Sequence, residues 1–262
     1  MRLTFLGTGT SFGVPQIGCG CAVCTSADPR DRRNRSGAVI QARGRTLLVD
    51  TPPELRVSLL AAGIRSVDAV LYTHDHADHI HGIDDLRALS GHSRGQLPVY
   101  GPADALERMR ARFDYIFDPH ARPIPGSSRP DVVATALEPG VEAEIAGVRV
   151  LPLRFAHGPS TVLGYRFGPL GYLTDVKEVP GEERAALAGL EVLVLNALFH
   201  RPHPTHLSIP EAVETARALG ARRTYLTHLT HETSHAALLA ELPPGIEPAY
   251  DGLVVEVQGS AG

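Results

Sequence analysis

The stretch Thr73-His74-Asp75-His76-Ala77-Asp78-His79 holds three histidines and two aspartates within six residues. So many imidazoles and carboxylates cannot lie close together unless they are solvated, paired or bound to a metal. The apolar run of residues 67–73 predicts a buried strand before the cluster, and the apolar spacing of residues 82–89 predicts a helix after it. A loop between a strand and a helix is a usual place for a site in an α/β protein. We therefore interpret the stretch as part of a metal site rather than as a solvated, histidine-rich turn.

The composition is that of an ordinary globular protein with a sizeable core. Of the 262 residues, 43% are hydrophobic and 21% are charged. The formal net charge of −4 argues against binding of nucleic acid through a basic face. No apolar run approaches the roughly 20 residues of a membrane span, so we expect a cytoplasmic protein. Because no stretch has the composition of a linker, we predict a single domain over residues 1–262.

The hydrophobic pattern predicts strands and helices in both halves of the chain. Strands are expected at residues 2–6, 36–42, 46–50, 67–73, 97–100, 141–145, 148–155, 162–167, 171–174, 192–195, 224–227 and 252–257. Helices are expected at residues 53–62, 82–89, 102–117, 181–188, 208–219 and 234–242. Residues 118–130, rich in Pro, Arg and Ser, are expected to form a loop or lid. This order predicts an α/β fold of two sheets packed face to face with helices outside.

Further ligand candidates follow later strands, since one short loop cannot enclose two ions. His157, Asp175 and His228 each stand at or just after the end of an apolar strand. Any one of them alone would more often be a structural residue. Because several strand ends deliver His or Asp, we expect these side chains to meet the histidine cluster at one edge of the sheets.

This set of residues resembles the metallo-β-lactamase superfamily over nearly the whole chain. The resemblance implies an α/β fold of the four-layer αββα sandwich type. It implies a dinuclear site in which one ion is bound by His74, His76 and His157, the other by Asp78, His79 and His228, and both by Asp175. Asp50, at the end of a predicted strand, resembles the aspartate that orients a ligand imidazole in this family.

The resemblance also implies how such a site reacts. Two divalent ions about 3.5–4 Å apart repel each other, and a bridging carboxylate and hydroxide offset that repulsion. We therefore count Asp78 and Asp175 among the catalytic residues. The bridging water would be deprotonated near neutral pH and would serve as the nucleophile. Nitrogen and oxygen ligands suit two divalent ions such as zinc or manganese, or iron, and the residues alone do not choose among them.

A second metal site is indicated by the cysteines, which are three in number and crowded together as Cys19-Gly20-Cys21-Ala22-Val23-Cys24. An odd number at this spacing suits a metal better than disulfides, although three free thiols remain an alternative. His231 is not needed by the dinuclear site and would complete a tetrahedral zinc site. We expect this structural zinc to pin the loop at about residues 18–35 and to join the start of the chain to its end.

Together these features resemble one group within the superfamily, the PhnP-type phosphodiesterases. The similarity rests on Gly7-x-Gly9, Gly13-Val14-Pro15, the cysteine loop and Thr227-His228-x-x-His231. That family acts on 5-phosphoribosyl 1,2-cyclic phosphate and has a structural zinc held by three cysteines and one histidine, which here match Cys19, Cys21, Cys24 and His231.

A late histidine completes the resemblance. By its position before the helix at Ser208, His206 matches the catalytic histidine of that family. The match implies that His206 donates to a phosphoryl oxygen or acts as a general acid on the leaving oxygen. His200 and His203, in the same loop, are expected to be solvated, and their roles stay open together with that of His81.

The resemblance therefore implies a metal-dependent phosphodiesterase for a small, cyclic phosphodiester, such as phosphoribosyl 1,2-cyclic phosphate or a cyclic nucleotide. A transfer-RNA 3′-processing nuclease shares the ligands but needs a basic arm, and the net charge is wrong for one. A lactonase or thioesterase stays open because the same nucleophile attacks a carbonyl carbon. A non-enzymatic scaffold would require seven incidental ligands. We expect a small phosphodiester as partner, no membrane and no nucleic acid, and we leave open whether the chain forms a homodimer.

Overall fold

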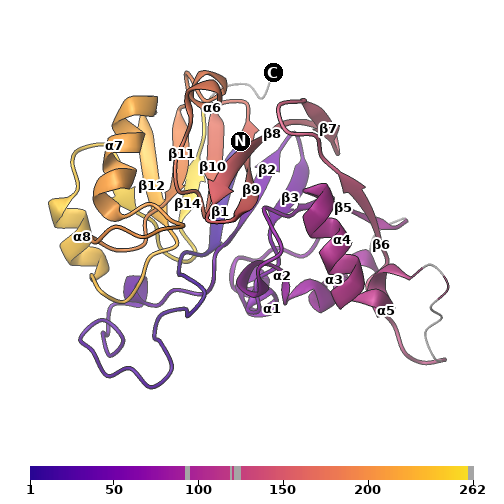
Figure 1. Cartoon of the computed structure of the whole chain (residues 1–262). Coiled ribbons are helices and arrows are strands. Elements are labelled where there is room, and N and C mark those ends of the chain that lie inside the picture. The colour runs from indigo at the N-terminus through magenta and orange to yellow at the C-terminus, as the bar shows by residue number, and fades with distance from the viewer. Residues whose placement is uncertain (92–94, 119, 121–124, 259–262) are drawn as a thin grey trace.

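Two seven-stranded β-sheets packed face to face form the centre of residues 1–91, 95–118, 120 and 125–258, which the computed structural model describes (Figure 1). The first sheet has the strand order β14-β1-β2-β3-β4-β5-β6 and the second the order β13-β12-β11-β10-β9-β8-β7. Each sheet is made almost entirely from one half of the chain. The last strand, β14, is the exception, because it pairs with β1.

The strands of the first sheet are β1 (Arg2–Gly7), β2 (Gly37–Ala42), β3 (Arg45–Val49), β4 (Ala69–Leu71), β5 (Leu97–Gly101), β6 (Val132–Ala136) and β14 (Val254–Glu256). Strands β3 to β6 run parallel. The strands of the second sheet are β7 (Ala143–Ile145), β8 (Val148–His157), β9 (Ser160–Phe167), β10 (Leu170–Leu173), β11 (Val192–Asn196), β12 (Arg223–Thr227) and β13 (Ile246–Pro248). Strands β10 to β13 run parallel. Parallel strands place their carboxyl ends at one edge of each sheet.

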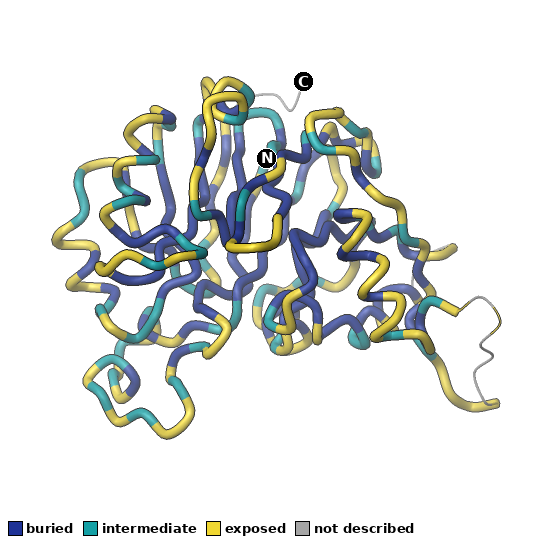
Figure 2. The backbone as a smooth tube through the Cα atoms, viewed as in Figure 1, coloured by how far each residue is buried: buried dark blue, intermediate teal, exposed yellow. Residues whose placement is uncertain are grey.

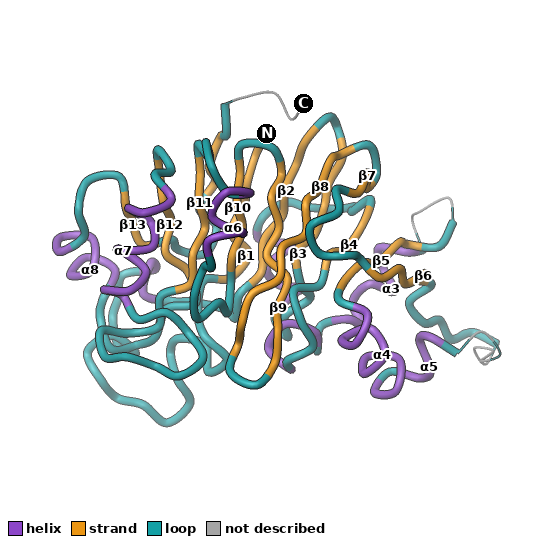
Figure 3. Tube along the Cα trace, turned by 45° about the horizontal axis from the view of Figure 1, so that its top comes forward, coloured by secondary structure: helices purple, strands orange, loops and turns teal. Residues whose placement is uncertain are grey.

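Helices cover the outer face of each sheet (Figures 1 and 3). Those on the first sheet are α1 (Leu55–Ala61), α2 (Ala77–Ile80), α3 (Leu86–Ser90), α4 (Ala103–Arg112) and α5 (Asp114–Phe117). Those on the second are α6 (Gly181–Ala186), α7 (Ile209–Leu219) and α8 (His235–Glu241). Two 3₁₀ turns lie at Pro29–Asp31 and Ile83–Asp85. Among the described residues, no helix has both the length and the apolar character to cross a membrane.

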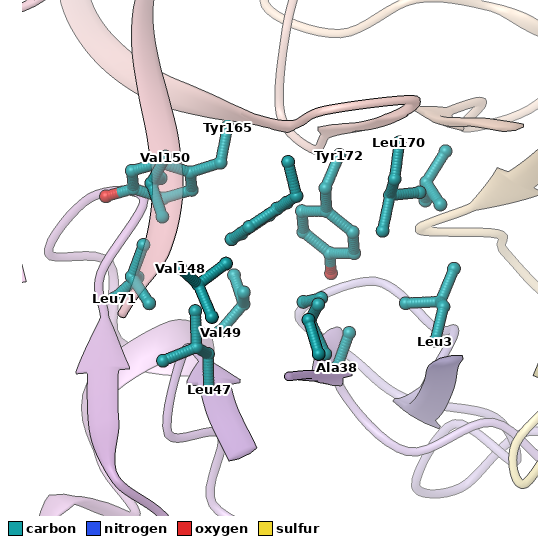
Figure 4. Packing of buried hydrophobic residues seen from close by; sticks show 14 of the residues in the cluster. Leu3, Ala38, Leu47, Val49, Leu71, Val148, Val150, Tyr165, Leu170 and Tyr172 are labelled. Carbon is teal, nitrogen blue, oxygen red and sulfur yellow. The ribbon is translucent and has the colours of Figure 1, made fainter. Parts of the chain in front are cut away.

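Three apolar layers lie between these four layers of structure. The central one packs the inner faces of the two sheets together, with Leu47 and Leu71 of the first sheet opposite Val148 and Tyr165 of the second (Figure 4). Two outer clusters pack the helices against their sheets. The strands are accordingly the most deeply buried part of the chain (Figure 2). The predicted αββα sandwich is confirmed.

Several predicted boundaries were wrong. Helical structure begins at Ala77, so Asp78 and His79 lie on the short helix α2 and not on a loop, and a 3₁₀ turn interrupts the helix expected from Gly82. The helix expected over residues 102–117 is divided at Phe113, whose φ of −122° and ψ of 47° are not helical. Strands β6 and β13 were not predicted. Of the loop expected at residues 118–130, residues 119 and 121–124 lie outside the described residues.

Candidate metal centre

The predicted ligands come together at the edge where the carboxyl ends of both sheets meet. The nearest ligand atoms of His74, His76 and His157 lie within 4.8 Å of one another, and so do those of Asp78, His79 and His228. These are the two groups that the resemblance to the metallo-β-lactamase superfamily implies for two ions. The geometry therefore gathers side chains from the segment after β4, from the end of β8 and from the residue after β12.

Asp175 lies between the two groups. Its Oδ2 is 3.3 Å from Nε2 of His79, and its Oδ1 is 3.2 Å from Nε2 of His228. Asp175 also forms a third close group with His74 and His79. Asp175 forms a further close group with His157 and His206, so its carboxylate lies near histidines of both ligand groups, as a bridging ligand would.

The backbone turns sharply where it delivers three of these residues. Asp50, Asp175 and His228 have φ values of 61°, 61° and 59°, in the left-handed region. Non-glycine residues rarely adopt this conformation, which costs of order 1–3 kcal/mol per residue and persists only where the surrounding structure enforces it. Such strain concentrates at functional sites. Here it turns each side chain inward at the end of a buried strand.

Hydrogen bonds fix which ring nitrogen of the histidines faces the centre. His79 Nδ1 lies 2.8 Å from Asp50 Oδ2, and His74 Nδ1 lies 2.9 Å from Thr73 Oγ1. Because Thr73 Oγ1 donates to Asp50 at 2.9 Å, it accepts from His74. Both rings therefore carry a proton on Nδ1 and direct Nε2 to the centre, as metal-bound histidines do. Asp50 therefore lies where it can orient the imidazole of His79, as the resemblance implies.

The nitrogens that face the centre fit divalent metal ions. Nε2 of His74, His79 and His228 is buried without a hydrogen-bond partner in the described structure. Oxygens of Asp175 lie 3.3 and 3.2 Å from Nε2 of His79 and of His228 but form no hydrogen bond of good geometry with them. A buried polar atom without a hydrogen bond costs about 1–3 kcal/mol, so such nitrogens around one centre are unusual in a native protein. Imidazole nitrogens and carboxylate oxygens are the donors that ions such as Zn²⁺ and Mn²⁺ accept.

The charges around the centre also favour a cation. Burial works to raise the pKa of Asp78 and of Asp175, but the neighbouring imidazoles outweigh it and hold both values below the ordinary range. Burial lowers the pKa of His74 well below its ordinary value. Burial acts in the same direction on His79, yet the surrounding carboxylates, Asp175 first, raise its pKa well above 6.5. The carboxylates therefore favour positive charge at this point, which a bound metal ion would supply.

The centre opens into a pocket with a volume of about 320 Å³. Its lining consists of Ser11, His76, Asp78, His157, Pro159, Ser160, Asp175, Thr205, His206 and His228. A larger hollow of about 400 Å³, beside α4 and β9, contains none of the candidate ligands. The pocket at the metal centre is of the size of a small molecule.

The loop between β11 and α7 places His206 at this pocket. Nε2 of His206 is 2.9 Å from Asp175 Oδ1. His203 lies behind it, with the two Nδ1 atoms 3.3 Å apart, so His203 is not a freely solvated residue. His200 points elsewhere and lies 2.6 Å from Glu241 Oε1. His81 is exposed and contacts Phe113, not the centre.

Two other described histidines, His120 and His235, do not join the centre. His120 is exposed, and His235 is buried beside Tyr250. His92 lies outside the described residues.

Comparisons with known proteins agree with this architecture. Residues 45–229 match the family model of the β-lactamase superfamily domain. The chain belongs to this superfamily. Membership identifies it as a metal-dependent hydrolase and implies divalent metal ions at the centre.

Three named proteins are similar to the chain over most of its length. A crystal structure of a diphosphatase from the PhnP family is 40% identical and covers 98% of both chains, with a TM-score of 0.89. A ribonuclease Z of Methanopyrus kandleri is 29% identical over 92% of this chain and 96% of its own. An octanoyltransferase of Porphyromonas gingivalis is 40% identical over 97% of this chain, which spans about half (51%) of that relative's length.

This member of the β-lactamase superfamily carries a second cluster of ligand atoms, whose residues do not line the pocket. Those of Cys19, Cys21, Cys24 and His231 lie within 4.8 Å of one another. His231 Nδ1 is 3.3 Å from the sulfur of Cys21, and this contact is the main reason why the pKa of that thiol falls to about 6. Burial raises the pKa of Cys24 to about 11. Four donors of these types fit a tetrahedral zinc ion, so the structural zinc stays a prediction that the geometry accommodates.

One feature of the motif was missed by the sequence reasoning. Asp75, between two candidate ligands, is buried, and its carboxylate accepts hydrogen bonds of 2.9 and 2.6 Å from Arg108. Arg112 lies 2.9 Å from the same carboxylate. The only sequence signal was the four-residue spacing of the two arginines on a predicted helix.

Proposed function

We propose that the chain is a dinuclear metal-dependent phosphodiesterase that hydrolyses a small phosphodiester, such as phosphoribosyl 1,2-cyclic phosphate or a cyclic nucleotide. The observation that carries the proposal is the position of His206. Its Nε2 stands beside Asp175, at a pocket that the two candidate ligand groups also line. A phosphodiester has both non-bridging oxygens to bind and a leaving oxygen to protonate. Metal ions held by the two ligand groups would bind the first, and His206 is placed to donate to the second.

The candidate ligands would form two metal sites that share Asp175. His74, His76 and His157 would hold one ion, Asp78, His79 and His228 the other, and Asp175 both. Ions bound there would polarise the phosphoryl oxygens and supply the activated water.

Asp50 would orient a ligand histidine, and His206 would donate a proton or hydrogen bond to the substrate. Asp50 keeps the ring of His79 in place through the 2.8 Å hydrogen bond to Nδ1. His206 donates a hydrogen bond through Nε2 to an oxygen of the substrate, where charge develops as the bond to the leaving group breaks.

Hydrolysis of a diphosphate is the second candidate. It is favoured by the 40% identity, over 98% of both chains, to a diphosphatase of the PhnP family. A diphosphate presents the same non-bridging oxygens and needs less help at its leaving group. A transfer-RNA 3′-processing nuclease is supported by the ribonuclease Z relative, but the net charge of −4 does not favour a polyanionic substrate.

A substrate panel tests the proposal. Purified protein loaded with Mn²⁺ or Zn²⁺ is assayed on bis(p-nitrophenyl) phosphate, 2′,3′-cyclic nucleotides, phosphoribosyl 1,2-cyclic phosphate, a nucleoside diphosphate, a precursor transfer RNA, a lactone and a thioester. We expect the highest kcat/KM on a small phosphodiester. The Asp175→Ala variant, assayed in parallel, identifies any contaminating activity. A kcat/KM that is highest on the lactone or thioester would reject the proposal, and a preference for the diphosphate would select the second candidate.

A further inference from the structure

Thr205, in the loop before α7, contacts three different histidines through its three polar groups. Its backbone N–H lies 3.3 Å from Nδ1 of His203, and its hydroxyl lies 2.8 Å from Nδ1 of His206 and, at the longer distance of 3.2 Å, near Nδ1 of His203. Its carbonyl oxygen lies 3.1 Å from Nδ1 of His157. Two of these histidines line the pocket. A single residue therefore connects a candidate metal ligand to the proposed proton donor.

The chemistry of these groups decides which nitrogens carry protons. A carbonyl oxygen only accepts, so His157 Nδ1 is protonated and Nε2 is left free for a metal ion. A backbone N–H only donates, so His203 Nδ1 accepts. His206 Nε2 faces the Asp175 carboxylate at 2.9 Å and must carry a proton. In the neutral ring of His206, Nδ1 is then a lone pair that accepts from the hydroxyl of Thr205.

Packing holds Thr205 in this position. Gly158, directly after His157, has a φ of 61°, and a Cβ there would lie 2.6 Å from Cγ2 of Thr205. The absence of a side chain at Gly158 lets the loop approach the end of β8. The loop is also anchored by the bond of 3.1 Å from Leu207 N to Val176 O.

We propose that Thr205 is a positioning residue that sets the tautomers of both His157 and His206. Through its carbonyl it leaves Nε2 of His157 free for the metal centre, and through its hydroxyl it keeps the proton of His206 on Nε2, which faces Asp175 at the wall of the pocket. The inference rests on the proposed role of His206, but it does not depend on which phosphodiester is the substrate.

Substitution of the hydroxyl separates the two roles. Thr205→Val keeps the backbone and the shape of the side chain but removes the donor to His206. We expect full metal content and an unchanged melting temperature. Groups that orient catalytic ligands are worth about 10–100-fold, so kcat on an alkyl diester should fall by roughly that factor. Thr205→Ser, which keeps the hydroxyl, should restore kcat to within a few-fold of the parent. Thr135→Val, at an exposed position of β6, serves as the control.

A spectroscopic measurement keeps the test independent of the substrate. In long-range ¹H–¹⁵N spectra of zinc-loaded protein with labelled histidine, the signals that disappear in His206→Ala identify that ring. We expect the Nε2–H tautomer in the parent and in Thr205→Ser, and loss of this single tautomer in Thr205→Val. Should Thr205→Val not fold, Thr205→Ala provides the same comparison. An unchanged His206 tautomer in the hydroxyl-free variant would overturn the proposal, even if no diester proves to be a substrate.

Discussion

At the scale of the residue, His206 and Asp175 are neighbours, but their alanine variants should lose activity for different reasons. If His206 assists the leaving oxygen, His206→Ala should keep both ions and lose about 10²–10⁴-fold in kcat on an alkyl diester, the usual value of general acid catalysis. The loss should shrink on a p-nitrophenyl diester, because a good leaving group needs little protonation. Steady-state kinetics and elemental analysis of the same preparations measure both effects.

Asp175→Ala is the contrasting variant. It removes the carboxylate that lies 3.3 Å from His79 and 3.2 Å from His228, so metal and turnover of every substrate should be lost together. An equal loss on activated and unactivated diesters in His206→Ala would instead assign His206 to charge stabilisation. Parent-like rates would remove it from the mechanism.

Residues that follow apolar strands were the predictable part of the site. His157, Asp175 and His228 stand out in the sequence because a polar side chain follows a run that must be buried. The contacts of Asp75 and Thr205 were not predictable, since each depends on how distant segments pack. Asp75 lies 33 positions from Arg108, and the spacing of Arg108 and Arg112 on a predicted helix does not identify Asp75 as their partner.

At the scale of the element, helix α4 holds the metal-binding segment in place. Arg108 and Arg112, one turn apart, both bind the carboxylate of Asp75, and Arg112 also donates to its carbonyl oxygen. In Arg108→Ala/Arg112→Ala the carboxylate loses both of its charged partners. We expect weaker metal binding, by about 10–100-fold, because the flanking histidines lose their fixed orientation. Competition with a zinc chelator measures this affinity.

Arg110 provides the matched control for α4. It lies on the same helix but donates to the carbonyl of Ala134, so Arg110→Ala should bind metal as the parent does. Adding Asp75→Asn to the double arginine variant removes the unpaired charge and should recover stability without restoring affinity. Parent-like zinc affinity in the double arginine variant would show that α4 does not position the motif.

The elements that were not predicted share a weak hydrophobic signal. Strand β6 is an edge strand in which Val133 is 44% exposed, so its apolar residues do not alternate cleanly. Strand β13 has three residues and ends in proline. Helix α2 has four residues, two of them candidate ligands, and a metal-binding pattern hides the helical period. In each case tertiary packing decides what the local sequence leaves ambiguous.

At the scale of the whole molecule, the long connection from β1 to β2 joins the two sheets. Gly9 bridges to both Arg35 and Leu229, and buried Arg33 donates to the carbonyl of Ala249. The cysteine cluster lies on this connection, and its fourth donor, His231, follows β12 in the other half of the chain. A zinc ion there would close a loop of about 210 residues, since the Cys21–His231 contact spans that separation.

The last prediction follows from that closure. We expect three metal ions per chain, two at the centre and one zinc at the cysteines. Cys21→Ser should lose the third ion and a few kcal/mol of stability, because structural zinc contributes folding free energy directly. The ligands of the dinuclear centre remain in place, so the other two ions should stay bound. Elemental analysis and thermal unfolding measure the two effects, with Ala22→Ser, an exposed change in the same loop, as control. Equal zinc content and an unchanged melting temperature in Cys21→Ser would mean that the cluster is three free thiols beside a histidine.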